Sequence, residues 1–509
     1  MPFALVLGIL LIRNAFLFST PLYEDADMGA NSLLIEQARR FTLLVGHYSQ
    51  DRFNHPGPAF LYVQSWGESL FWSWLHVVPT AWNGQLIAVY ALNALFAALV
   101  VAVGYGWTRP ARGATGATGA AGATAVVACF AALHPAAFSS DWIPYSLVPA
   151  YFAFLVAIAS VTAGRGQDAW IAALTGWFLI HGYASFLFFV PLICLAALFA
   201  VAWPRRGRLR SCARRLIRQR RIWVPVVVIS ALFALPIALE LASHWPGNFG
   251  KYLSYSSSSR SPLPSGAQVT DFTLWLWWPH AHAWLAALVL CAAAGLLTWR
   301  LPPGPVRRFC GSLIAFDALS TVLFEVYAVT GVRDLWQSFA GYFYWSAPAI
   351  LLLVIVLSAL ELLPSRLGAA AAVTAALAAC AAFAVAPLTR TSTDHTDPDS
   401  LATGANTDPA LAAGVARVAA LARGKPIVIT FKHDAWPEVT GFLLQAQRTG
   451  VTACVADPDW AFMMTTQLIC TPAELGNGAE FGLYVPGTVP PGTQVVFRLR
   501  RALVTSGAK

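Results

Sequence analysis

Long apolar runs alternate with short polar segments along the first 387 residues. A helix that crosses a membrane needs about 20 apolar residues, and eleven segments approach that length. They are residues 3–20, 84–107, 119–138, 146–163, 169–183, 185–203, 223–242, 282–299, 309–330, 344–363 and 368–387. The run 169–203 is divided near Gly182; a single kinked crossing there would reverse every later orientation. The pattern predicts a polytopic α-helical membrane protein with about eleven transmembrane helices.

Basic residues are unevenly distributed over the loops between these segments. With a cytoplasmic N-terminus, the inner loops hold 16 basic residues and one acidic residue, whereas the outer loops hold 6 basic and 9 acidic residues. Cytoplasmic loops carry the excess of Lys and Arg. The distribution therefore favours this orientation and predicts that residues 388–509 are extracytoplasmic.

The tail has a different pattern. After a polar stretch it alternates between helical and strand-like segments, which is typical of a small α/β domain. We expect helices at 408–423 and 436–448, and strands at 426–431, 451–455, 481–485 and 494–499. The chain is thus expected to comprise a membrane domain, 1–387, and a tail domain, 388–509. The tail has no glycine-rich phosphate loop, which favours a cap or support role over a nucleotide site.

Composition agrees with a membrane protein, because 57% of the 509 residues are hydrophobic and only 11% are charged. The net charge of +9 does not indicate nucleic-acid binding, since nine arginines lie in the inner loop 204–222 alone. Of eight cysteines, only Cys454 and Cys470 lie in a polar region. On the outer face these two are expected to form a disulfide.

The first outer loop, residues 21–83, is long and carries three clustered acids, Glu24, Asp25 and Asp27. A helical stretch, 31–44, follows. A polar segment with Arg52, Asn54 and His55 comes next, and then an aromatic stretch, 60–76, expected to lie along the membrane surface. Clustered acids can simply be a solvated loop. Here they share the loop with a His-Pro-Gly-Pro turn of restricted geometry, which favours a reaction centre.

Chemistry on an outer membrane face has no nucleotide pool, so a transferase there would use a lipid-linked donor. A carboxylate could act as general base on an acceptor hydroxyl, and cations could hold the leaving phosphate. The cations expected in outer loops are Lys251, Arg260 and Arg333, and His181 lies at a predicted outer turn. No metal-ligand cluster is visible, although a divalent cation near Asp25 and Asp27 is possible.

Several motifs extend this interpretation. The acidic motif follows the first span, and the same loop contains Gly46-His47-Tyr48-Ser49 and Asn54-His55-Pro56-Gly57-Pro58. Further motifs are Trp142-Ile143-Pro144-Tyr145, Pro246-Gly247-Asn248, Ala435-Trp436 and Arg13 in the first span. With many spans and an outer tail, the sequence resembles the GT-C fold polyprenyl-phosphate-dependent glycosyltransferases. It is most similar to a bacterial branch with an Asn-His-Pro-Gly-Pro motif. It departs from that branch in lacking a tryptophan in the acidic motif.

The resemblance implies an inverting membrane glycosyltransferase of the bacterial inner membrane. The donor would be a polyprenyl-phosphate sugar, and the acceptor a cell-envelope glycan or glycolipid. Asp27, or else Asp25, would be the base, and Glu24, Arg52, Asn54 and His55 would bind substrate. The aromatic helix would hold the lipid.

Two alternatives remain open. Asp317 and Glu325 lie eight residues apart within one predicted span and therefore on one helix face. Charges inside a span are usually paired or functional, so these two acids could line a proton or ion path in a transporter or flippase. The other alternative is a non-catalytic scaffold for envelope assembly that binds a partner through the tail.

Overall fold

A computed structural model describes the chain except residues 1, 109–115, 204–218, 258–262, 280–281, 333, 336, 387–408 and 507–509. The chain forms two compact units. The first, here the helical unit, comprises Met1–Asn14 and Val89–Pro387. The second, here the loop-tail unit, comprises Ala15–Ala88 and Leu388–Lys509. The first outer loop therefore groups with the tail rather than with the other predicted spans.

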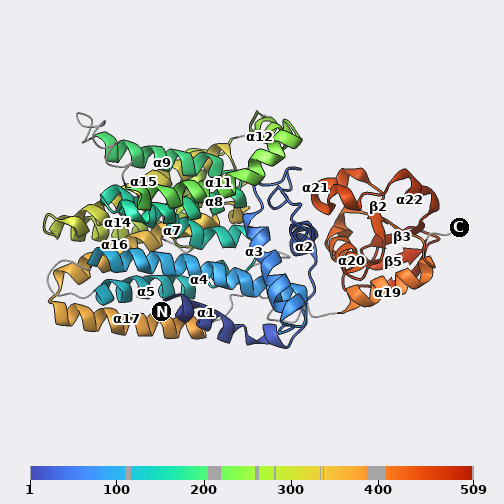
Figure 1. Cartoon of the computed structure of the whole chain (residues 1–509), viewed down its shortest axis with the longest axis horizontal. Helices are drawn as coiled ribbons and strands as arrows, with labels where there is room; N and C mark the ends of the chain where they lie inside the picture. Colours follow the sequence, from blue (N-terminus) through green and yellow to red (C-terminus); the bar gives the residue numbers. More distant parts are fainter. Residues whose placement is uncertain are drawn as a thin grey trace. The chain divides into compact units, whose positions relative to one another are not determined.

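The helical unit consists of helices that run largely side by side in Figure 1. They are α1 (Pro2–Arg13), α5 (Gly116–Leu133), α6 (Ala136–Ser139), α7 (Ile143–Ala163), α8 (Ala169–Gly182), α9 (Phe186–Ala202), α11 (Arg220–Ser243), α12 (Gly247–Ser257), α13 (Gly266–Trp277), α14 (Ala283–Arg300), α15 (Pro305–Thr330), α16 (Ser346–Leu362) and α17 (Ser365–Val385). Two 3₁₀ helices lie at Gly166–Asp168 and Ser338–Trp345, and α4 (Ala81–Thr108) continues into this unit from the loop-tail unit. Every predicted span overlaps one of these helices.

Seven helical segments of the described chain are long and apolar enough to cross a membrane: Ala81–Thr108, Ile143–Ala163, Arg220–Ser243, Ala283–Arg300, Pro305–Thr330, Ser338–Leu362 and Ser365–Val385. The expectation of a mostly helical chain with several helices able to cross a membrane is thereby confirmed, while the count of eleven crossings stays a prediction. The predicted division near Gly182 is also present, because α8 ends there and α9 begins at Phe186.

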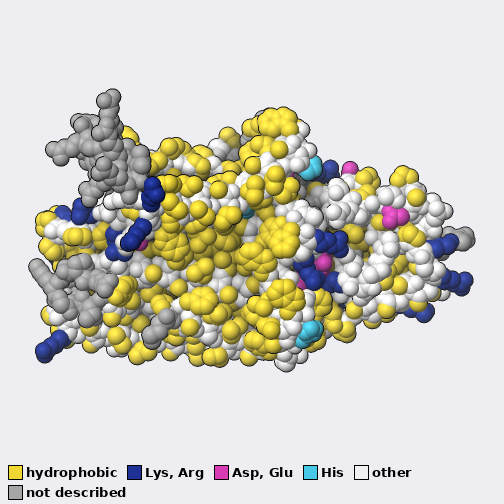
Figure 2. Space-filling view, viewed as in Figure 1, with side chains coloured by type: hydrophobic (Ala, Val, Ile, Leu, Met, Phe, Trp, Pro, Cys, Tyr) yellow, Lys and Arg dark blue, Asp and Glu magenta, His cyan; other side chains and the backbone are white. Residues whose placement is uncertain are grey.

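The outward-facing sides of several helices are apolar. No residue in the apolar stretch of α11 is buried, and few are in α14 and α17. Leu232, Leu288 and Leu377 are among the exposed side chains, and Figure 2 shows hydrophobic side chains covering much of the visible face of this unit. Soluble proteins rarely expose apolar patches of such extent. These helix faces are therefore suited to lipid.

The loop-tail unit combines the first loop with a mixed sheet. The segment Ala15–Ala88 contributes a 3₁₀ turn at Ala15–Phe18, α2 (Ala26–Ala38), and α3 (Ala59–Gly67), which continues as a π-helix over Glu68–Trp74. The tail contributes α19 (Ala410–Ala422), β1 (Ile427–Phe431), α20 (Trp436–Arg448), β2 (Ala453–Val455), α21 (Ala461–Met464), α22 (Pro472–Asn477), β3 (Ala479–Tyr484), β4 (Gln494–Arg498) and β5 (Leu503–Ser506), with short 3₁₀ turns at His433–Ala435, Pro458–Trp460 and Thr466–Leu468.

The sheet has the strand order β2-β1-β3-β5-β4. Strand β1 pairs in parallel with β2 and β3, and β5 pairs antiparallel with β3 and β4. The six elements expected in the tail are all present, and β5 is an additional strand. The expected disulfide between Cys454 and Cys470 is also formed.

Helices α2 and α20 approach each other very closely, and glycines permit this approach. A Cβ added to Gly29 would lie 2.7 Å from Oγ1 of Thr440, and one added to Gly441 would lie 2.6 Å from the carbonyl oxygen of Glu24. The Thr440 hydroxyl also donates a hydrogen bond to the Ala26 carbonyl at 3.1 Å. The backbone of the acidic motif is thus held directly against the tail helix.

Helix α2 begins earlier than the predicted stretch 31–44. Asp25 has an extended backbone and is the N-cap residue, so Asp27 lies in the first helical turn rather than in a preceding loop. The helix ends at Ala38, and Phe41 follows with φ at 57°, a left-handed conformation that a helix does not accommodate. The predicted helix starts too late because the apolar periodicity of the sequence becomes clear only after the acidic residues.

Candidate active site

The acids Asp25 and Asp27 lie at the N-terminus of α2, and both are half-buried. The Tyr48 hydroxyl donates a hydrogen bond to Oδ1 of Asp27. Tyr48 belongs to the polar segment between α2 and α3, where it forms an antiparallel bridge with Asn54. The Asp27 carboxylate is therefore oriented by the same loop that carries the His-Pro turn. A helix N-terminus also favours negative charge.

A third carboxyl group comes from the tail and was not expected from the sequence. Glu438 lies in the first turn of α20 and is only 3% exposed. Its Oε1 atom has no hydrogen-bond partner among the described residues. Burial and, to a smaller extent, the negative charge of Asp25 raise the pKa of Glu438 to about 7, although Arg501 and Arg500 lower it. At neutral pH this carboxyl group can accordingly both release and accept a proton.

Glu24 is buried in an ion pair with the tail. Arg448, the last residue of α20, donates from Nη1 to Oε2 of Glu24 at 2.9 Å and from Nη2 to Oε1 at 2.8 Å. The Ser32 hydroxyl donates to the same Oε1 atom at 3.2 Å. A substrate would have to displace this pair to reach Glu24. Its geometry supports a structural role next to Asp25 rather than substrate binding.

The Glu24–Arg448 pair is part of a larger buried network. Nε of Arg448 lies 3.3 Å from Oε1 of Glu36, and Nη2 lies 3.6 Å from Oε2 of Glu68. Glu68 also pairs with Arg39 at 2.9 Å and accepts a hydrogen bond from the Gln85 amide at 2.8 Å. Burial opposes ionisation of Arg448, but Glu24 and then Glu68 raise its pKa above the usual value. Arg448 therefore keeps its charge although it is buried.

Glu68 is a fully buried acid of this network. Burial raises its pKa, Arg448 lowers it, and the neighbouring Glu36 raises it. Three carboxylates share two guanidinium groups here, so one carboxyl group has incomplete charge compensation. Every charged member belongs to the first loop except Arg448, which makes that arginine the electrostatic link between loop and tail.

The polar segment between α2 and α3 forms a hairpin closed by two histidines. The His55 backbone N–H donates to the His47 carbonyl at 2.8 Å, and the Gly46 N–H donates to the His55 carbonyl at 2.8 Å. Burial lowers the pKa of His47 to about 3, and burial together with the neighbouring His47 lowers the pKa of His55 to about 3. Both rings are neutral at physiological pH. His55 therefore offers no positive charge to a donor phosphate, and a role in shaping the loop fits it better.

Arg52 and Asn54 belong to the same hairpin. Arg52 is exposed, has φ at 63°, and its guanidinium lies 5.9 Å from the ring centroid of Phe462 in the tail. The Asn54 amide donates to the Gly46 carbonyl at 3.3 Å and so stabilises the hairpin. Arg52 is exposed, so its positive charge can reach a ligand, whereas Asn54 carries no charge.

The remaining expected site residues are spread over the helical unit or lie outside the described part of the chain. Lys251 is exposed on α12. His181 is buried in α8, where Nε2 lies 2.9 Å from the Phe233 carbonyl oxygen, so it has a packing role there. Arg260 and Arg333 lie outside the described residues. Tail cations instead act on the acids: Arg448 pairs with Glu24, and Arg501 and Arg500 lower the pKa of Glu438.

Metal binding receives no support from the side chains that the structure describes, since no group of three or more His, Cys, Asp or Glu residues among them could hold an ion. A divalent cation at Asp25 and Asp27 would need further ligands, from water or from a substrate. Phosphate oxygens are one such source.

Comparison with known proteins identifies no relative of this chain. No protein-family model matches the chain, and no curated protein matches it. Any functional conclusion therefore depends on the chemistry of the residues themselves.

The acids of the transporter alternative lie on α15 of the helical unit. Asp317 is 4% exposed, and its Oδ1 atom has no hydrogen-bond partner among the described residues. Hydroxyl groups surround this part of α15: Tyr151 bonds Ser320 at 2.6 Å, and Tyr344 donates to Thr321 at 2.7 Å. Glu325 is half-buried two turns later. These side chains form a polar cluster around Asp317 inside the helical unit.

Proposed function

We propose that this protein is a membrane glycosyltransferase that uses a polyprenyl-phosphate sugar as donor. The supporting observation is the set of carboxyl groups Asp25, Asp27 and Glu438, which first loop and tail bring together at the N-termini of α2 and α20. The apolar faces of the helical unit fit a donor whose lipid lies in the membrane. The acceptor would be a glycan or glycolipid of the cell envelope.

The reaction follows from these groups. Asp27, positioned by Tyr48, removes the proton from an acceptor hydroxyl. The hydroxyl oxygen then forms a bond to the anomeric carbon of the donor sugar, and the bond from that carbon to the phosphate oxygen breaks with inversion. The phosphate leaves with the electron pair. Arg52 is an exposed cation of the hairpin between α2 and α3 and would pair with the leaving phosphate.

The Cys454–Cys470 disulfide supports an extracytoplasmic tail, because disulfides persist in oxidising compartments. The charge distribution of the sequence supports the same orientation, with a cytoplasmic N-terminus in a bacterial inner membrane.

The test uses the purified protein in lipid vesicles with radiolabelled polyprenyl-phosphate sugars and envelope glycans. Replacing Asp27 by Asn should reduce transfer about 10²- to 10⁴-fold, the usual contribution of a general base. Asp25→Asn should have a smaller effect, and Asp51→Asn is the matched control on the same loop. Full activity in the Asp25→Asn, Asp27→Asn double variant would refute the assignment.

A transporter or flippase is the second candidate, because Asp317 is buried and its Oδ1 atom lacks a hydrogen-bond partner among the described residues. In that case Asp317→Asn would abolish proton-coupled or lipid transport in vesicles, and loss of the first-loop acids would be tolerated. An assembly scaffold would tolerate both sets of changes and lose its partner when the tail is removed.

A further inference from the structure

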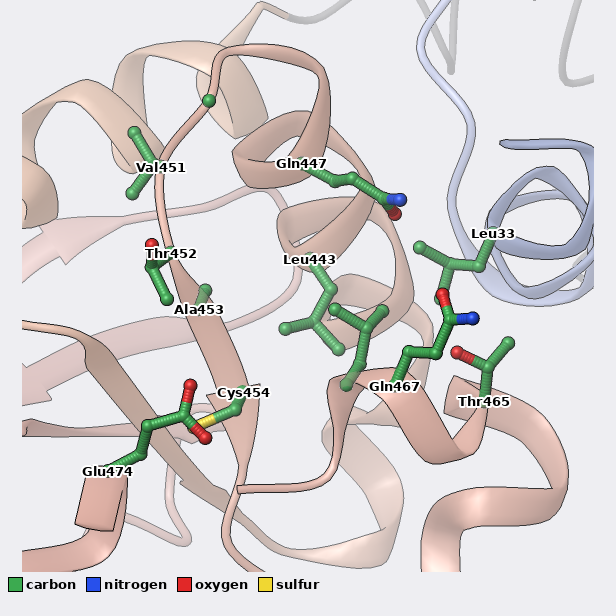
Figure 3. Close-up of a pocket in the computed structure, with 12 residues that line it drawn as sticks. Leu33, Leu443, Gln447, Val451, Thr452, Ala453, Cys454, Thr465, Gln467 and Glu474 are labelled. Carbon is green, nitrogen blue, oxygen red and sulfur yellow. The ribbon is translucent and has the colours of Figure 1, made fainter. Parts of the chain in front are cut away.

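A pocket in the loop-tail unit is lined by none of the carboxyl groups Asp25, Asp27 and Glu438. It has a volume of about 280 Å³ and is lined by residues of α2, α20, β2 and the segment around Thr465–Leu468. Figure 3 shows Gln447, Gln467 and Thr465 pointing toward Leu33 of α2, while Glu474 lies at the other end near Cys454. The volume is just below the usual range for small-ligand pockets, roughly 300–1,000 Å³.

The lining is polar but almost uncharged. Gln447 and Gln467 offer amide donors and acceptors, and Thr452 and Thr465 offer hydroxyls. Leucine side chains supply apolar surface between them, and none of the lining residues is Lys, Arg or His. An anionic ligand such as a phosphate would find no countercharge here. A sugar ring fits, because its hydroxyls pair with amides and its C–H faces pack on aliphatic groups.

The single charged residue of the lining is already engaged. Oε2 of Glu474 accepts hydrogen bonds from the Thr471 backbone N–H and hydroxyl, both at 2.8 Å. These bonds form the N-terminal cap of α22 and lower the pKa of Glu474. The Glu474 carboxylate therefore maintains the wall of the pocket rather than selecting a cation.

The pocket walls are fixed before any ligand arrives. The Cys454–Cys470 disulfide joins β2 to the segment that carries Gln467, and the Cys470 N–H donates to the Val455 carbonyl at 2.9 Å. Thr465 has φ at 65° and ψ at 149°, a region that β-branched residues rarely occupy. Such backbone strain is concentrated at ligand sites, where the surrounding structure enforces it. Rigid walls also reduce the entropy lost on binding.

Two helices that line the pocket, α2 and α20, also carry residues of the carboxyl site. Leu33 follows Asp27 by six residues of α2, about 9 Å of helix rise. On the opposite wall, Gln447 directly precedes Arg448, which holds Glu24. We propose that this pocket binds an uncharged sugar unit of the acceptor glycan one to two helical turns from the base. Its identity as an acceptor subsite rests on the proposed function, whereas sugar binding itself does not.

The first experiment measures binding without catalysis. The full-length protein in detergent micelles is titrated with mannose, galactose, arabinose and short neutral oligosaccharides, observed by saturation-transfer NMR and calorimetry. Mannose 6-phosphate and glucosamine serve as charged probes. We expect neutral sugars to bind, and each of Gln447→Ala and Gln467→Ala to weaken binding about three- to ten-fold. Gln494→Ala, an exposed glutamine on β4, is the matched control and should leave binding unchanged.

The outcomes separate this inference from the proposed function. Sugar binding that is lost in the glutamine variants and kept in Asp27→Asn supports the pocket even if no transfer activity is found. If transfer occurs and the glutamine variants raise the acceptor KM without changing kcat, the acceptor subsite is supported. Absence of binding by every neutral sugar, preference for the phosphorylated or amino sugar, or equal binding by wild type and variants would overturn the inference.

Discussion

Arg448 and Glu24, which are 424 residues apart in the chain, form a two-point ion pair with N–O distances of 2.8 and 2.9 Å. The pair is buried, and each additional contact of Arg448 also leads to a first-loop acid. The position of the acidic motif is therefore determined by the end of helix α20. The residue next to a proposed base is held by a side chain from the other end of the molecule.

Replacing Arg448 by Met should destabilise the loop-tail unit by about 3–5 kcal/mol, because it leaves buried carboxylates without their counterion. Urea unfolding of the full-length protein, followed by tryptophan fluorescence, measures the change. The double variant Arg448→Met, Glu24→Gln should be less destabilised than the sum of the single variants. Arg417→Met, an exposed arginine on α19, is the control. Strict additivity of the two changes would contradict a direct pair.

Gly441→Ala should destabilise the same unit by about 1–3 kcal/mol, the usual effect of overpacking. The new methyl group would lie 2.6 Å from the Glu24 carbonyl oxygen and 2.8 Å from Cδ1 of Leu411, so α2 and α20 must separate. Gly476→Ala on α22 is the control, because a Cβ there meets no atom within 4 Å. Thermal melts compare the two variants. Equal melting temperatures would show that the helices do not pack as closely as described.

Acid should destabilise the hairpin between α2 and α3. The pKa of His47 is about 3 in the folded protein and near 6.5 when unfolded, so the unfolded chain binds more protons between these values. The free energy of unfolding therefore keeps its full value above pH 6.5. It falls as the pH is lowered, by about 2 kcal/mol per buried histidine at pH 5.

His47→Phe should remove part of this loss, whereas His433→Phe should not, because the His433 side chain is 80% exposed. Melting temperatures at pH 7.5 and pH 5 provide the comparison. The same acid sensitivity in wild type and His47→Phe would mean that His47 is not buried in neutral form.

Glu438 should show the opposite dependence on pH. Its pKa is about 7 in the folded protein and near 4.5 when unfolded, so the folded chain holds a proton that the unfolded chain releases. The contribution of Glu438 to the free energy of unfolding is fully present below pH 4.5. It declines by about 3 kcal/mol as the pH rises to 7. Glu438→Gln should abolish this decline and stabilise the protein at pH 8, measured by urea unfolding. Glu480→Gln, exposed on β3, should not. A decline of unchanged size in Glu438→Gln would assign the titration to another group.

Much of the fold could be predicted because it depends on local pattern. Apolar runs longer than a helical turn predict the helices of the helical unit, and alternating segments predict the tail strands. Strand β5 was missed because the segment Leu503–Ser506 is short and follows two arginines. The start of α2 was missed because its first turn is acidic and small rather than apolar.

The site could be predicted only on the side of the first loop. Asp25 and Asp27 are conspicuous as neighbouring acids, whereas Glu438 and Arg448 are single charges at the ends of an ordinary amphipathic helix. Their importance arises from packing between segments about 400 residues apart, which periodicity does not encode. For His55, the sequence does not reveal the burial that keeps the ring neutral.

The link between α2 and α20 also has a consequence for biosynthesis. Glu24 leaves the ribosome 424 residues before Arg448, a delay of about 20–85 s at roughly 5–20 residues per second. During that time all the intervening apolar helices are synthesised while the carboxylates of the first loop lack their arginine. Asp25, Asp27 and Glu438 can therefore come together only after the last helices of the chain have been made and the tail has folded. A truncated or stalled chain carries the first-loop acids without Glu438 and Arg448.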